Sequence, residues 1–402
     1  MKFSFYTLGC KVNQYETQAM QQMLLSHGHT LGEFDEPCDG YIVNSCTVTA
    51  VSDKKTRNAI RRAQKLNPDA AVGVCGCYAQ SAPDEVRALG VDVMVGTADR
   101  EAFVLQMEQA AQDKKNHAHW EKVAPSNLPR EFEQLPAGGL AARTRALLKI
   151  EDGCNNFCTY CIIPYARGRV RSLPVEQALE QTVRLADAGV HEIVLTGIEI
   201  ASYGKDFEPQ VSLTELLEKL LTAQPNVQFR LGSLDPRAVD DAFCERLAGF
   251  ANLARHFHLS MQSGCDTVLR RMNRHYTSEE FYRCVERLRR AFPDCSVTTD
   301  LIVGFPRLRT SLRRRWPFWR DARSRPCMYS RILRARAQRR PPCRVSSISR
   351  PKPPAPRGQS RWQKRSALPI ESSLSAARCT RCLSTRPAAC GRRTDATAFL
   401  YI

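Results

Sequence analysis

The chain has 402 residues, of which 43% are hydrophobic and 25% charged, a composition typical of a globular protein with two or three domains. No run is apolar enough to span a membrane, and residues 1–6 lack the basic and apolar regions of a signal peptide, so we expect a cytoplasmic protein without a membrane partner. Seventeen cysteines in a reducing compartment favour metal ligation over disulfides.

The net charge of +18 is unevenly distributed. Residues 307–402 hold 25 Lys and Arg against 3 Asp and Glu, whereas residues 1–306 hold 34 basic against 38 acidic residues. The basicity therefore belongs to the last segment alone. It does not indicate that the rest of the chain binds nucleic acid.

The first 113 residues alternate short apolar runs with amphipathic stretches, which predicts a parallel, Rossmann-like α/β domain. Three predicted strands, residues 3–9, 41–45 and 71–76, are each followed by a cysteine: Cys10, Cys46 and Cys77. The carboxyl ends of parallel strands share one crevice, so these thiols can converge on a metal site. The alternative is that small buried cysteines merely favour strand ends.

Residues 114–139 are polar, contain proline and lack periodicity, which predicts a linker. Five strands and four helices then alternate, which predicts a partial (β/α) barrel with chemistry at its carboxyl-terminal rim. The predicted strands are 146–151, 192–197, 228–233, 256–262 and 296–304, and the helices are 175–188, 213–221, 240–247 and 278–291.

Cys154, Cys158 and Cys161 are separated by three and then two residues, just after the first barrel strand. This spacing lets three thiolates bind three irons of one [4Fe-4S] cluster and leaves the fourth iron open for a cofactor. It is the signature of the radical S-adenosylmethionine (SAM) enzymes. A structural zinc site is the alternative, but His191, the nearest later histidine, lies beyond a predicted helix.

An ordered series of motifs over residues 1–306 closely resembles the methylthiotransferase family of radical SAM enzymes, in its MtaB-type branch. The matching segments are 7–17 (TLGCKVNQYET), 44–49 (NSCTVT), 76–80 (GCYAQ), the cluster motif, 163–168 (IPYARG), 195–198 (LTGI), 261–266 (MQSGCD), 271–277 (RMNRHYT) and 300–306 (DLIVGFP). The runs Lys-Val-Asn-Gln at 11–14 and Pro-Tyr-Ala-Arg-Gly at 164–168 are typical of this branch. Sister branches act on isopentenyladenosine in tRNA or on a ribosomal protein.

The resemblance implies two [4Fe-4S] clusters, one held by Cys10, Cys46 and Cys77 and the other by Cys154, Cys158 and Cys161. The resemblance also implies their roles: the cluster on Cys154, Cys158 and Cys161 would cleave SAM to a radical that removes hydrogen from C2 of the target adenine. Sulfur at the other cluster would be methylated and inserted. The implied substrate is N6-threonylcarbamoyladenosine at position 37, in the tRNA anticodon stem-loop. The implied electron donor is a protein such as flavodoxin or ferredoxin.

Further site residues are predicted from their place in these motifs. The candidates for SAM contacts are Tyr160, Thr196, Gly197, Gln262 and Ser263. We expect Arg167 and Arg274 to meet RNA phosphate or the substrate carboxylate, with simple exposure to solvent as the alternative. We expect Asp152 to support the cluster loop and not to act as a catalyst.

The resemblance ends after Pro306. Residues 307–402 hold 23 Arg, 2 Lys and 10 Pro with no sustained periodicity, which indicates translation in a shifted reading frame. We therefore predict a disordered tail in place of the last barrel strand and the RNA-binding TRAM domain, and a radical SAM core limited to residues 140–306. An Arg-rich RNA-binding arm is an alternative for the tail, and an inactive remnant of the enzyme is one for the chain.

Overall fold

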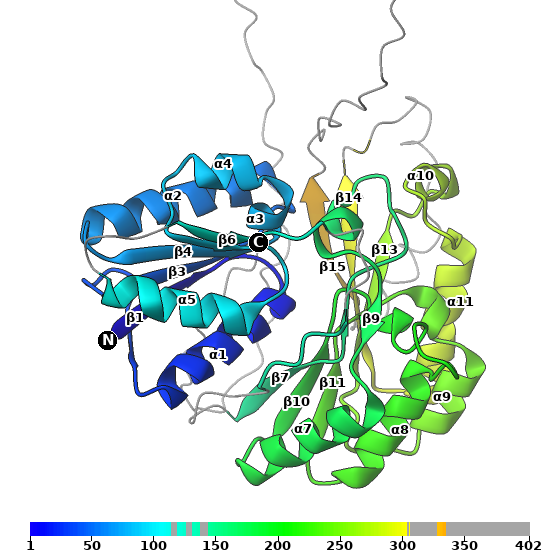
Figure 1. Ribbon diagram of the computed structural model, residues 1–402. Coiled ribbons are helices and arrows are strands. Elements are labelled where there is room, and N and C mark those ends of the chain that lie inside the picture. Colours follow the sequence, from blue (N-terminus) through cyan, green and yellow to red (C-terminus); the bar gives the residue numbers. More distant parts are fainter. Residues whose placement is uncertain (114–118, 126–130, 137–143, 304, 306–327, 335–402) are drawn as a thin grey trace, which may run out of the picture. The chain divides into compact units, whose positions relative to one another are not determined.

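The computed structural model describes residues 1–113, 119–125, 131–136, 144–303, 305 and 328–334 (Figure 1). Within these ranges no helix combines the length and apolarity needed to cross a membrane. A parallel α/β domain comes first along the chain and a partial (β/α) barrel follows, so the predicted fold class is confirmed.

The N-terminal sheet has six parallel strands in the order β2-β1-β3-β4-β5-β6. They are β1 Lys2–Thr7, β2 Thr30–Gly32, β3 Gly40–Ser45, β4 Ala71–Gly76, β5 Val93–Val95 and β6 Trp120–Lys122. The three predicted strands correspond to β1, β3 and β4. The segment predicted as a linker instead contributes β6, a three-residue edge strand that is too short to show an alternating pattern.

Helices cover both faces of this sheet (Figure 1). They are α1 Lys11–Ser26, α2 Ala50–Leu66, α3 Cys77–Ser81, α4 Pro83–Arg87 and α5 Arg100–Gln112. On one face, α1 and α5 bury Met20, Leu24 and Phe103. On the other, α2 buries Ile60 and α4 buries Val86. The two apolar layers hold the central strands, whose carboxyl ends are followed by Cys10, Cys46 and Cys77.

The barrel strands also run parallel, in two sheets of order β11-β10-β7 and β12-β13-β14-β15. They are β7 Arg145–Lys149, β10 Glu192–Thr196, β11 Gln228–Leu231, β12 Ser233–Leu234, β13 His256–Gln262, β14 Ser296–Val303 and β15 Met328–Arg334. Gly232 joins β11 directly to β12, so this strand links the two sheets. A small antiparallel pair, β8 Glu151–Asp152 and β9 Arg171–Ser172, flanks the cysteine loop.

The four predicted barrel helices are present and lie outside the strands (Figure 1). The barrel helices are α6 Ile163–Arg167, α7 Val175–Asp187, α8 Leu213–Ala223, α9 Asp241–Leu247, α10 Asp266–Arg271 and α11 Ser278–Ala291, with 3-10 turns at Ile200–Ser202 and Pro236–Ala238. Capping boxes fix two helix starts, Ser212 with Glu215 at α8 and Thr277 with Glu280 at α11.

The prediction that the tail supplies no barrel strand, which would leave β14 at the edge of its sheet, is wrong. Strand β15 pairs with it in parallel over seven residues, from Val297 opposite Met328 to Val303 opposite Arg334. An edge strand needs only backbone donors and acceptors in register, and this segment, MYSRILR, includes Tyr and Ile, which favour strands. The Arg and Pro bias of the whole tail obscured it. The predicted disorder of residues 307–327 and 335–402 lies outside the described residues.

Candidate active site

Three cysteines lie at the ends of neighbouring strands of the N-terminal sheet. Cys10 follows β1, Cys46 directly follows β3, and Cys77 begins α3 after β4. Burial raises the pKa of Cys46, and a Cys10 thiolate raises it further. Burial raises the pKa of Cys77 to about 12, with Cys46 and Cys10 adding to it. The three thiols are therefore close enough to affect one another, as the strand-end pattern predicted.

Gly76 makes the turn from β4 into Cys77. Its φ is +96°, and an added Cβ would lie 2.4 Å from the carbonyl oxygen of Ser45. A side chain at this position would therefore push apart β3 and β4. The Ser45 hydroxyl donates to the carbonyl oxygen of Cys75 at 2.5 Å and accepts the Tyr78 N–H at 3.2 Å, which fixes the start of α3.

Cys154 begins the second cysteine loop, between β8 and α6. Gly153 precedes it with φ +86°, and an added Cβ there would lie 2.0 Å from the carbonyl oxygen of Arg169. The Cys154 N–H donates to the carbonyl oxygen of Gly168 at 3.1 Å. Burial raises the pKa of Cys154 to about 12, and Cys161 contributes to the increase. The loop therefore folds back closely on residues 168–169.

The middle of the loop is held by the segment after α10. The Thr159 N–H donates to the carbonyl oxygen of Met272 at 3.1 Å. Arg274 Nη1 donates to Cys158 Sγ at 3.4 Å, and Nη2 pairs with Asp235 at 3.2 Å. The Arg274 side chain is only 6% exposed. The Arg274 guanidinium is therefore buried against a cysteine sulfur and is not exposed to RNA phosphate, while its contact with the substrate carboxylate stays a prediction.

Each cysteine trio offers three sulfur ligands but no compact site for one ion. In the described part of the chain, no group of three or more His, Cys, Asp or Glu is arranged to hold a single metal ion. The thiols around a cubane bind different irons, so a cluster does not require a compact single-ion site. The donor sets fit [4Fe-4S] ligation, because Cys77 senses the charges of Cys46 and Cys10, and Cys161 interacts with both Cys154 and Cys158.

The residues predicted to contact SAM lie in the cysteine loop or at strand ends. The ring of Tyr160 packs edge-on against Phe305, with centroids 6.4 Å apart. Thr196 is the buried last residue of β10, and an added Cβ at Gly197 would lie 2.7 Å from Oε2 of Glu151. These positions remain predictions for cofactor binding.

Gln262 and Ser263 stand at the carboxyl end of β13. Gln262 has φ +59°, and the register between β13 and β14 shifts between Leu259 and Gln262. Ser263 is buried, and its hydroxyl accepts the Cys265 N–H at 3.3 Å. The strand end is therefore irregular at the two residues predicted to contact SAM, and their role in cofactor binding stays a prediction.

The motif comparison missed Glu199, three residues beyond the end of β10. Its backbone N–H donates to Oε2 of Glu151 at 2.7 Å, and its Oε2 accepts the Asn156 amide at 3.5 Å. Burial raises the pKa of Glu199 to about 7. Among the described residues, Oε1 of Glu199 and Oε1 of Glu151 are buried without a hydrogen-bond partner. The signal in the sequence that could have identified Glu199 is its position directly after the motif at 195–198.

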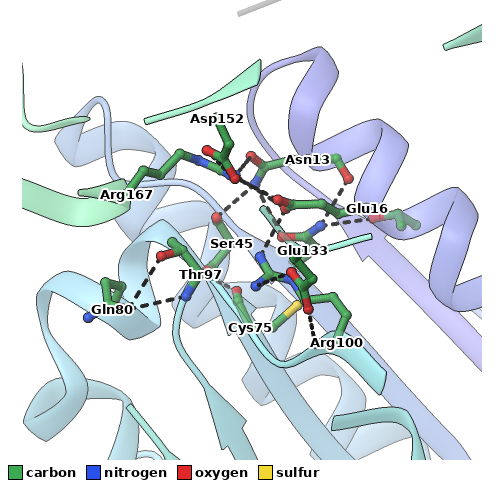
Figure 2. A network of polar contacts seen from close by, with 12 residues as sticks. Asn13, Glu16, Ser45, Cys75, Gln80, Thr97, Arg100, Glu133, Asp152 and Arg167 are labelled. Carbon is green, nitrogen blue, oxygen red and sulfur yellow. Dashed lines mark hydrogen bonds and ion pairs between the residues drawn. The ribbon is translucent and has the colours of Figure 1, made fainter. Parts of the chain in front are cut away.

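Arg167 links the two cysteine-bearing regions (Figure 2). Its Nη1 donates to Oε1 of Glu16 at 2.8 Å and to Oδ1 of Asp152 at 3.1 Å, and its Nη2 donates to Oδ1 of Asn13 at 3.0 Å. The same Asn13 oxygen accepts the Cys10 thiol at 3.5 Å. Asp152 accepts the N–H of Gly153 at 2.8 Å, which is the supporting role expected for it.

Arg167 is fully buried, so the expected contact of this residue with RNA is wrong. It belongs to a larger buried ion network. Glu16 also contacts Arg100 at 3.0 Å and Lys149 at 3.7 Å, while Asp152 pairs with Arg171 at 3.0 Å. Burial would lower the pKa of Arg167, but Glu16 and Asp152 raise it well above its ordinary value. The network joins α1 and α5 to β7, β8 and α6.

Comparisons with known proteins agree with this architecture. Residues 2–96 match the uncharacterized protein family UPF0004, and residues 148–309 match the radical SAM superfamily. The threonylcarbamoyladenosine tRNA methylthiotransferase MtaB of Bacillus subtilis is 43% identical over 305 residues, covering 75% of this chain and 67% of the relative. The protein of the same name from Aquifex aeolicus is 36% identical over 307 residues, covering 76% of this chain and 74% of the relative.

A similar fold occurs in a solved structure of TsrM, a radical SAM methyltransferase from Kitasatospora setae with cobalamin and a [4Fe-4S] cluster bound. The TM-score is 0.55 at 15% identity, over 82% of this chain and 74% of that one. At this identity the likeness concerns the fold alone.

Proposed function

Because this chain belongs to the MtaB-type methylthiotransferases, a family of radical SAM enzymes, we propose that it adds a methylthio group to C2 of N6-threonylcarbamoyladenosine at position 37 of tRNA. The observation that carries the proposal is the contact between Asn13 and Arg167. It brings together the two runs typical of this branch, 11–14 and 164–168, and it connects the two cysteine loops.

The enzyme uses SAM and a [4Fe-4S] cluster, which we assign to Cys154, Cys158 and Cys161. We assign a second cluster to the other trio, Cys10, Cys46 and Cys77. When bound, SAM and the clusters supply the radical and the sulfur for replacing an unactivated aromatic C–H. An electron donor such as flavodoxin or ferredoxin completes the system.

The chain's own residues prepare the cysteines and enclose the reaction. Burial raises the pKa of Cys154, Cys161 and Cys77, so ligation must release a proton that the free thiols hold tightly. The Arg274 N–H bond to Cys158 stabilises negative charge on that sulfur. Oε1 of Glu199 is buried close to the cysteine loop and is suited to accept a hydrogen bond from the ammonium group of SAM.

The substrate assignment rests on the branch-typical runs and on the similarity to proteins named for threonylcarbamoyladenosine. An RNA base must leave its stack before C2 can enter a buried site, so the target is an unpaired position in a loop. The alternatives are a sister-branch substrate, isopentenyladenosine in tRNA or a ribosomal protein, and an inactive remnant.

Nucleoside analysis of tRNA tests the substrate. The chain is expressed in a bacterial strain lacking its own tRNA methylthiotransferases, and digested tRNA is analysed by mass spectrometry. We expect 2-methylthio-N6-threonylcarbamoyladenosine, and none with a Cys158→Ala control. Only the isopentenyl product would identify the sister branch. Neither product, despite full iron loading, would support the inactive remnant.

Metal analysis tests the cluster assignment separately. After anaerobic reconstitution we expect about two [4Fe-4S] clusters per chain, and roughly one in the triple variant Cys154→Ala, Cys158→Ala, Cys161→Ala. Zinc in place of iron and sulfide would support the structural zinc site. Unchanged iron in the triple variant would contradict the assignment of this trio.

A further inference from the structure

An exposed aromatic group lies beside the second cysteine loop. Tyr165, on α6, is 61% exposed, more than any other large hydrophobic residue in the described ranges. Its ring meets the ring of Phe157 edge-on, with centroids 5.6 Å apart. The guanidinium carbon of Arg169 lies 4.8 Å from the centroid of the Phe157 ring, and Arg169 is itself exposed. We call Phe157, Tyr165 and Arg169 the aromatic platform.

The backbone holds the platform in a defined conformation. Phe157 has φ +46°, a left-handed conformation that costs energy for a residue with a side chain. The Asn273 amide stabilises it by donating to the carbonyl oxygens of Asn156 at 2.9 Å and Phe157 at 3.3 Å. Because Cys158 follows directly, the position of the Phe157 ring is fixed relative to the cysteine loop.

The chemistry of the platform matches an unpaired RNA base better than a structural role. Tyr165 contacts Phe157 and still leaves 61% of its surface exposed, which is available to a stacking partner. Aromatic rings and arginine planes are the groups on which splayed bases stack, and the same arginine can contact phosphate. Arg271 is also exposed, and its carbonyl oxygen accepts the Thr159 hydroxyl at 2.8 Å, so a further cation stands on the segment that holds this loop.

We propose that the aromatic platform stacks an unpaired nucleobase next to the target adenosine in the tRNA anticodon loop. This inference rests on the proposed function, because it assumes that tRNA is the substrate. Stacking of a neighbouring base holds the loop open while the target base enters the site. The aromatic platform thereby selects RNA loops in which the base next to the target adenosine is unpaired.

Binding of an anticodon stem-loop RNA tests the platform. The RNA carries fluorescent 2-aminopurine beside the target adenosine, and the protein is the reconstituted 402-residue chain. We expect the fluorophore to be quenched on binding. Tyr165→Ala should weaken binding roughly 5- to 150-fold and relieve quenching, whereas Tyr165→Phe should behave as wild type. Leu105→Ala, which changes an exposed apolar residue on α5, is the matched control and should have no effect.

The salt dependence of RNA binding distinguishes the contribution of Arg169 from that of the aromatic rings. Arg169→Ala should reduce the slope of log Kd against log salt by about one, and Tyr165→Ala should leave it unchanged. Arg184→Ala, an exposed arginine on α7, serves as the control. Iron content and circular dichroism equal to wild type show that each variant is folded.

The outcomes distinguish the platform from the proposed function. If Tyr165→Ala binds and quenches as wild type does, while wild type still methylthiolates tRNA, the platform is wrong and the function stands. If wild type quenches the fluorophore through Tyr165 but forms no product, the platform stands and the function fails. Absence of binding by wild type would overturn the platform.

Discussion

Substituting Glu16 by Gln removes one charge from the buried ion network and almost preserves the shape of the side chain. The carboxylate contacts Arg100, Arg167 and Lys149 at 3.0, 2.8 and 3.7 Å, and all four side chains are fully buried. Burial alone would raise the pKa of Glu16, but the three cations hold it well below its usual range. Glu16 therefore stabilises the fold above its unfolded pKa of about 4.3, and this stabilisation is lost as the pH falls through the lower folded pKa.

The expected cost of this substitution is about 3 to 5 kcal/mol in the free energy of unfolding, since removing one partner leaves buried charges uncompensated. Glu180→Gln is the matched control, because Glu180 pairs with Arg184 at 3.4 Å with 63% and 74% of the two side chains exposed. An exposed i,i+4 pair contributes only about 0.5 kcal/mol. The two Glu→Gln substitutions should therefore differ by several kcal/mol in their effect on the free energy of unfolding.

Urea unfolding of the reconstituted protein at pH 7, followed by circular dichroism under anaerobic conditions, measures the difference. The midpoint should fall clearly for Glu16→Gln and remain near wild type for Glu180→Gln, with similar slopes. If the free energies of unfolding of the two variants differ by less than about 0.5 kcal/mol, the charge of Glu16 does not stabilise the fold through the buried network.

Two further changes test the site. Gly153→Ala should lose about one cluster on reconstitution, because the added methyl group would lie 2.0 Å from the carbonyl oxygen of Arg169. Gly249→Ala is the control, because a methyl group there meets nothing within 4 Å. Equal iron loading of the two variants would contradict this prediction. Glu199 has its pKa raised to about 7 by burial, so the stability it provides at low pH is lost as the pH rises through 7. The melting temperature of Glu199→Gln should accordingly change less than that of wild type between about pH 5 and about pH 8. An equal change of melting temperature with pH in the two proteins would contradict this role of Glu199.

Sequence patterns were sufficient to predict the main strands and the placement of three cysteines at neighbouring strand ends. Cys10, Cys46 and Cys77 follow apolar runs of strand length, and in a parallel sheet equivalent strand ends must lie at one edge. The barrel strands and helices were visible for the same reason, since their apolar residues repeat with the period of each element. The edge strands β6 and β15 were not visible: β6 has only three residues, and the Arg and Pro bias of the surrounding segment obscured the seven residues of β15.

The buried charges could not be predicted from local pattern. Glu16 and Arg167 are separated by 151 residues, and nothing near either one indicates that they pair. Charged residues are usually exposed, which favoured the expectation that Arg167 would meet RNA. Glu199 was missed because its burial depends on Glu151, which arrives from β8.

The pairing of Asn13 and Glu16 with Arg167 restricts how this enzyme can be recombined with its relatives. A hybrid that took residues 1–113 from one protein and the barrel from another would bury a carboxylate or a guanidinium without its partner unless both sides carried matching residues. Gene fusions at residues 114–139 should therefore succeed only between parents that share this set. The boundary between exchangeable parts is set by the ion network and not by the chain segment that connects them.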